Sequence, residues 1–256
     1  MHINNFAKLG LCVFAVAVAQ SAFAAEDRRP MKAFTEIGYS LPHEVEFVAG
    51  DEHYVLLEGD EDEIDSIITE VKGDRLKVSR EDKWFGWSLD DRSVVITIGF
   101  VQIDTLNMAG SGDGHAEILD AETLTLRVTG SADLEVDEAT ADRLDISIAG
   151  SGNIQVHALE ADRVSSKIAG SGDIQLAGRV VSQEISISGS GDHDSGDLRT
   201  QETTASVRGS GDIRVWAEAR LSAAVTGSGD IEYYGEPEVS ERIVGSGDLV
   251  SLGSTR

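Results

Sequence analysis

The chain has 256 residues, with 46 Asp and Glu against 21 Lys and Arg, which gives a formal net charge of −25 at neutral pH. Such a negative surface argues against nucleic acid and anionic lipid as partners and favours cations or basic partners. A single cysteine leaves no internal disulfide to form.

Residues 1–24 have the pattern of a secretory signal peptide. Lys8 precedes the apolar run LGLCVFAVAVA (9–19), which is short for a bilayer span, and residues 22–24 form a small-x-small cleavage pattern. Cleavage there would also remove Cys12 and leave no membrane-spanning segment. We therefore expect an exported protein of the periplasm, the cell surface or the medium, with an uncleaved membrane anchor as the alternative.

Residues 25–105 alternate apolar and polar side chains without a fixed repeat. We expect them to form the irregular first part, or cap, of one domain that continues to the end of the chain. The pattern predicts strands at Val45–Val48, Tyr54–Leu57, Leu76–Val78 and Val94–Ile98, and one short helix over Glu61–Glu70.

An aromatic segment, KWFGW, interrupts this region at residues 83–87. Exposed aromatic rings can stack on sugars or anchor a protein partner, so Trp84, Phe85 and Trp87 are candidate ligand-binding residues. The more ordinary interpretation, which we favour, is that they fold over the end of the apolar core.

Residues 106–256 contain a repeated Gly-Ser-Gly-Asp element every 18 to 20 residues. Its copies begin at Gly110, Gly130, Gly150, Gly170, Gly189, Gly209, Gly227 and Gly245. In two copies Ala132 replaces the second glycine and Asn153 replaces the aspartate. A fixed period of this kind indicates a repeat architecture.

The residues around the element alternate in a similar way in most copies. The position two residues before the element is apolar in all eight copies, as at Ile148 and Ile168, and the position after it is apolar in six. About 20 residues are too few for a four-stranded propeller blade. The repeat therefore predicts an all-β fold, a parallel β-helix (β-solenoid) of about 20 residues per turn with Gly-Ser-Gly-Asp corners.

The glycines of the element suit a sharp corner, because glycine adopts positive φ without a Cβ clash. Ser and Asp can hydrogen-bond nearby backbone N–H groups at such a bend. The apolar alternating flanks argue against a disordered linker, and the absence of GxxxxGK[ST] argues against a nucleotide-binding loop.

The last position of the element forms a column of carboxylates across the repeats. These candidate cation ligands are Asp113, Asp133, Asp173, Asp192, Asp212, Asp230 and Asp248. We favour capping of the turns as their role. A straight column offers too few converging oxygens for a tight site, so we expect at most weak, multi-site Ca²⁺ binding and no other cofactor.

One repeat departs from the pattern at GDHDSGD (191–197), where the inward positions become polar. His193 lies there among Asp192, Asp194 and Asp197, and imidazole with carboxylates is a set that can bind a metal. The more ordinary interpretation, which we favour, is a weak turn that bulges outward.

The start FTEIGYSLPHEVEFVAGDEHYVLLEGDEDEIDSIITEVKGDRLKV, followed by serial GSGD turns, resembles the DUF2807 family, the putative auto-transporter adhesin head or GIN domain. The resemblance covers roughly residues 34–250. It implies a right-handed β-helix in an exported bacterial protein and supplies no catalytic residues.

These observations predict a non-enzymatic, exported β-solenoid that acts as a cell-surface or periplasmic binding, adhesion or scaffold module. A glycan or a surface protein is the expected partner. The alternative is a polysaccharide-active enzyme, a lyase or hydrolase, which rests only on analogy with other β-helix proteins.

Overall fold

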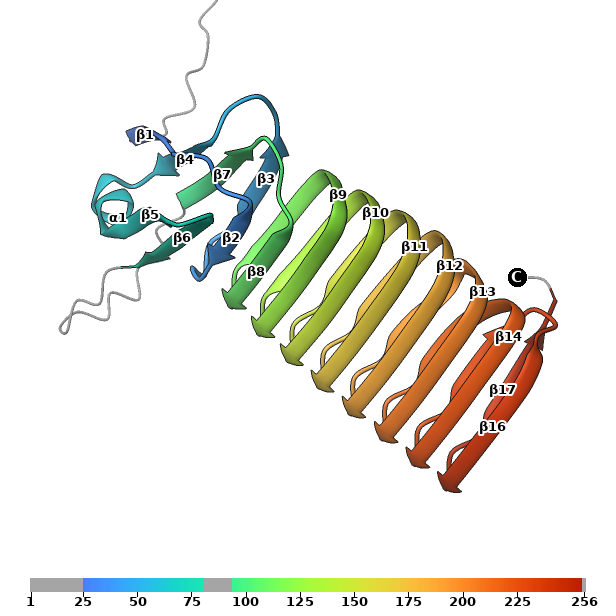
Figure 1. Ribbon diagram of the computed structural model, residues 1–256. Coiled ribbons are helices and arrows are strands. Elements are labelled where there is room, and N and C mark those ends of the chain that lie inside the picture. The colour runs from blue at the N-terminus through green and yellow to red at the C-terminus, as the bar shows by residue number, and fades with distance from the viewer. Residues whose placement is uncertain (1–24, 81–93, 255–256) are drawn as a thin grey trace, which may run out of the picture.

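The computed structural model describes residues 25–80 and 94–254. They form a β-solenoid of about seven turns, in which successive coils stack in parallel along one axis (Figure 1). The predicted fold class is confirmed.

The described residues of the irregular N-terminal part form seven strands and one helix. These are β1 (Ala25–Pro30), β2 (Glu36–Tyr39), β3 (Val45–Ala49), β4 (Tyr54–Gly59), α1 (Glu61–Ser66), β5 (Ile67–Lys72), β6 (Arg75–Arg80) and β7 (Val94–Phe100). The coils that follow are formed by β8 (Thr105–Gly110), β9 (Asp113–Gly130), β10 (Asp133–Gly150), β11 (Ile154–Gly170), β12 (Ile174–Gly189), β13 (His193–Gly209), β14 (Ile213–Gly227), β15 (Ile231–Tyr234), β16 (Glu238–Gly245) and β17 (Leu249–Gly253).

The repeat period of the sequence sets the register between coils. Leu134 in β10 pairs with Ile154 in β11, and Ile148 pairs with Ile168, so residues 20 positions apart are neighbours. Because equivalent residues stack directly, the apolar columns of the sequence become continuous columns inside the rod. Ile148 and Ile168 are each 2% exposed. The same column reaches the surface only at Ile243, in the last coil, where the side chain is 37% exposed.

The two glycines of a corner have different roles. The first has positive φ, for example +137° at Gly150, which is the strained region predicted for the bend. The second position is glycine in seven of the eight copies, Ala132 being the exception, because the coils lie so close together. A Cβ on Gly172 would lie 2.0 Å from the carbonyl oxygen of Gly152 in the preceding coil. The serine N–H groups bond across the same gap, as from Ser171 to the Gly150 carbonyl oxygen at 2.8 Å.

The N-terminal part joins the solenoid through parallel pairing of β2 with β8 and of β3 with β9. Its other strands are partly antiparallel: β4 lies between β1 and β7, and β5 pairs with β6. They cover one end of the rod (Figure 1).

The helix predicted over Glu61–Glu70 is shorter than expected. It spans Glu61–Ser66, with the Asp60 side chain accepting a hydrogen bond from the Glu63 N–H. The chain then continues as β5, because the β-branched Ile67, Ile68 and Thr69 favour the extended hairpin with β6.

Candidate functional site

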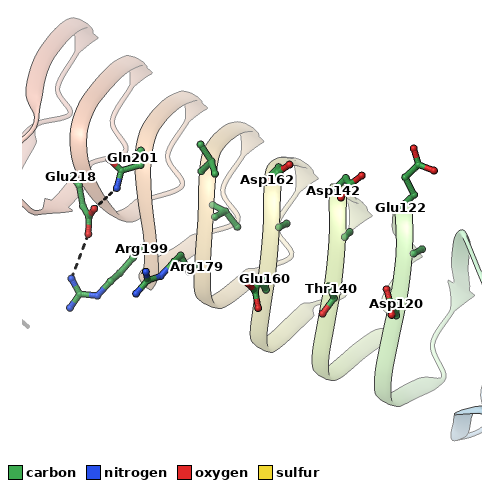
Figure 2. Close-up of a pocket in the computed structure, with 15 residues that line it drawn as sticks. Asp120, Glu122, Thr140, Asp142, Glu160, Asp162, Arg179, Arg199, Gln201 and Glu218 are labelled. Carbon is green, nitrogen blue, oxygen red and sulfur yellow. Dashed lines mark hydrogen bonds and ion pairs between the residues drawn. The ribbon is translucent and has the colours of Figure 1, made fainter.

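A groove of about 520 Å³ runs along the second bend of the coils, the bend that follows the Gly-Ser-Gly-Asp corner and lies at the middle of the long strands β9 to β14 (Figure 2). Its floor consists of short side chains at equivalent positions, Ala121, Ala141, Ala161 and Val180, which pair with one another from coil to coil. Because small residues occupy the bend in four successive coils, the depression extends along the rod axis.

Polar side chains border the groove in two rows (Figure 2). One row begins with Asp120 and continues over Thr140 and Glu160 to Arg179 and Arg199, and the other consists of Glu122, Asp142 and Asp162 with Gln201 and Glu218 further along. Carboxylates therefore dominate the half nearer the N-terminus, and two guanidinium groups lie in the other half. The arrangement offers hydrogen-bond acceptors and charge to an extended ligand.

Aromatic rings support the arginine end of the groove. The Arg199 guanidinium lies 3.9 Å from the centroid of the Trp216 ring, which in turn stacks on Tyr234 at a centroid distance of 5.5 Å. Arg199 also approaches the Glu218 carboxylate at 3.8 Å. Stacking and ion pairing together hold this guanidinium in place at the surface.

The corner aspartates form hydrogen bonds between coils. From Asp133 to Asp230, each side-chain oxygen accepts a hydrogen bond from the backbone N–H of the equivalent residue in the next coil, at 2.7 to 3.0 Å. Asn153 takes part in the same way and also donates its amide to Asp133. This arrangement agrees with capping, although the bonds connect coils rather than closing single turns. Weak Ca²⁺ binding by this column, Asp113 and Asp248 included, stays a prediction.

The structure separates the groups of the predicted His193 site. The imidazole is 1% exposed and lies in the inward column between Ile174 and Ile213. Asp192 belongs to the corner column outside, and Asp194 pairs with Arg214 at 3.1 Å. Because the ring points into the core while these carboxylates serve other partners, the three groups do not converge on one point.

Burial leaves His193 in an unusual state. Neither ring nitrogen has a hydrogen-bond partner among the described residues. Desolvation lowers the pKa of His193 to about 4, although the charge of Asp194 acts in the opposite direction. The ring is therefore neutral at physiological pH and has a structural rather than a ligand-binding position.

The aromatic candidates Trp84, Phe85 and Trp87, and the signal peptide predicted at residues 1–24, lie outside the described residues. Within the described residues, no helix is long and apolar enough to cross a membrane.

A cluster of histidines and carboxylates, which sequence reasoning missed, lies on the face between the corner column and the groove. His115 in β9 contacts Glu46 in β3 at 2.9 Å and Asp137 in β10 at 3.3 Å. His157 in β11 contacts Glu135 at 2.6 Å. The hydrogen bonds to Glu46 and Asp137 raise the pKa of His115, with the Glu46 bond contributing most.

The repeat contained the signal for this cluster. His115 and Glu135 are each five residues after the start of a corner element, and Asp137 and His157 are each seven residues after one. Both positions face outward, so a register of 20 residues places them side by side in neighbouring coils. Along the chain each histidine is distant from these carboxylates, and only the stacking of the coils brings them together.

A family model described as the putative auto-transporter adhesin, head GIN domain (DUF2807), matches residues 33–237. No curated protein matches the chain.

Solved structures share the fold over almost its whole length. A putative lipid binding protein from Parabacteroides distasonis ATCC 8503 is 27% identical, with a TM-score of 0.81 over 90% of this chain and 97% of that one. A putative adhesin from the same organism is 23% identical, with a TM-score of 0.83 and coverage of 89% and 96%. A putative adhesin from Parabacteroides merdae ATCC 43184 is 19% identical, with a TM-score of 0.82 and coverage of 89% and 95%.

Proposed function

The chain belongs to the DUF2807 family of adhesin head domains, and from this we propose that it is an exported, non-enzymatic binding and adhesion module. We place it at the cell surface or in the periplasm. The family and the adhesin-like structures support a binding role, and the pattern of residues 1–24 supports export.

The observation that carries the proposal is the groove along the second bend of the coils. It repeats the same small-residue floor and polar borders over several coils, so it presents an elongated surface rather than a single enclosed pocket. A rigid groove parallel to the rod axis fits a ligand that is itself extended. The parallel stacking holds this surface in place before binding, which limits the entropic cost of association.

The charge of the groove defines the partner further. Carboxylates outnumber the two guanidinium groups along its borders, and the whole chain has a net charge of −25. We propose an extended, positively charged segment of a surface protein as the ligand, because complementary charge speeds association and selects the partner.

The proposal is tested by screening the purified protein against peptide and glycan arrays. The variant Asp142→Lys/Asp162→Lys reverses two exposed charges on the groove border. Glu184→Lys/Glu241→Lys changes the net charge equally at exposed positions that do not line the groove. We expect the groove variant to lose basic-peptide binding by at least about tenfold while the control retains it.

Other outcomes would replace parts of the proposal. Equal losses in both variants would show that net charge, rather than the groove, attracts the ligand. Binding confined to glycans would replace the protein partner, and depolymerisation of a polysaccharide, abolished by one carboxylate substitution, would make the protein an enzyme. The mass of the mature N-terminus tests export separately, since cleavage after Ala24 is expected.

A further inference from the structure

We propose that Glu135, Asp137 and His157 bind a divalent transition-metal ion of the zinc class on the outer face of the rod. One ligand atom from each side chain lies within 4.8 Å of the other two. The residues come from the adjacent strands β10 and β11, whose register is fixed by parallel pairing on both sides of the cluster. The site is separate from the groove and does not depend on the proposed function.

The donor set selects the class of metal. Ca²⁺ and Mg²⁺ prefer oxygen ligands alone, whereas a neutral imidazole nitrogen with two carboxylates suits Zn²⁺ and related ions. Ligand atoms around a tetrahedral zinc ion lie roughly 3.4 Å apart, given bonds of about 2.0 to 2.2 Å. Small side-chain rotations achieve this spacing, because Glu135 and His157 are exposed. Water would complete the coordination.

The neighbours of His157 suit a ligand role. Its Nε2 atom faces Glu135 at 2.6 Å, and its Nδ1 atom lies 3.4 Å from the side-chain amide of Gln155. With the oxygen of that amide turned toward the ring, Gln155 accepts a hydrogen bond from Nδ1–H. The Nε2 lone pair is then free for the metal. Metal-ligating histidines generally donate their other ring N–H to an acceptor in this way, which fixes the tautomer.

His115 holds the second carboxylate. It lies between Glu46 and Asp137, with its Nδ1 atom on Glu46 and its Nε2 atom on Asp137. It therefore acts as a positioning residue for Asp137 rather than as a ligand. The carboxylates of Glu46, Glu135 and Asp137 repel one another on an already acidic protein, and a divalent cation would offset that repulsion.

The test is isothermal titration of the protein, purified without a polyhistidine tag, with ZnCl₂, alongside Co²⁺ absorption spectra that report four-coordination and an imidazole ligand. We expect one saturable Zn²⁺ ion per chain. His157→Gln and Asp137→Asn should each weaken binding by more than about tenfold, and His115→Gln should weaken it less while changing the Co²⁺ spectrum.

His43→Gln is the matched control, because His43 also pairs with a carboxylate, that of Glu63 at 3.1 Å, outside the cluster. Circular dichroism checks that every variant keeps the fold. The proposal is overturned if no saturable binding occurs, if His157→Gln binds as tightly as the unaltered protein, or if His43→Gln loses as much affinity as His157→Gln. Ca²⁺ binding that competes equally with Zn²⁺ would also overturn it.

Discussion

Replacing His193 by isoleucine should stabilise the protein. The imidazole occupies an inward column whose neighbours in the adjacent coils are Ile174 and Ile213, and it is 1% exposed without a hydrogen-bond partner for either nitrogen among the described residues. A buried, unsatisfied polar group costs about 1 to 3 kcal/mol. Isoleucine continues the apolar column with a side chain of similar volume, so we expect a gain of about that size at pH 7.

The gain should grow as the pH falls. The pKa of His193 is lowered to about 4 in the folded protein, against 6.5 for the unfolded chain. Between these values the unfolded state binds more protons, so folding stability falls with decreasing pH. Each pH unit in this window corresponds to about 1.4 kcal/mol, so the unaltered protein should lose about 3 kcal/mol that His193→Ile does not lose.

Urea unfolding at several pH values between 7 and 4, followed by circular dichroism, measures both effects. The matched control is Ile174→Val, a conservative change in the same column that leaves the histidine in place. It should lower stability slightly and keep the pH dependence of the unaltered protein. A His193→Ile variant that is no more stable at pH 7, or that shows the same pH dependence as the unaltered protein, would refute the reasoning.

Three further perturbations test the architecture. Gly172→Ala should lower the unfolding free energy by several kcal/mol or prevent folding, because its Cβ would lie 2.0 Å from a carbonyl oxygen. Gly50→Ala is the control, because its Cβ would meet nothing within 4 Å and the unfolding free energy should change little. Equal urea midpoints for the two variants would contradict the close stacking. Asp192→Ala should lower the unfolding free energy by about 1 to 3 kcal/mol, because the hydrogen bond from the Asp212 N–H is lost. Asp192→Asn should be tolerated, because the Asn153 side chain accepts the equivalent bond in its own coil. Equal melting temperatures for these two variants would argue against a capping role. Deleting Ala141–Glu160, one whole coil, should leave a shorter folded rod, whereas deleting half of this coil should prevent folding. Identical thermal melts for the two deletion variants would argue against a register of 20 residues.

The sequence alone was sufficient to predict the regular coils, because parallel, in-register stacking makes neighbours of residues that lie one period apart. The apolar alternation around Ile148 and Ile168 therefore identified core positions directly, and the glycine at each element start predicted the positive φ found at Gly150. The N-terminal part has no such repeat. The extent of α1 depended on whether Ile67 and its neighbours paired with β6, which is a contact between segments rather than a local preference.

The tertiary structure decided which polar residues meet. In sequence, His193 stands among carboxylates, but the alternation of a strand turns its ring inward and the adjacent carboxylates outward. Conversely, His115 and His157 are far apart in the chain and lie on one face, because the coils from β9 to β11 return to that face every 20 residues. The repeat determines which residues stack, whereas the bends determine which stacks share a surface and where a groove opens between them.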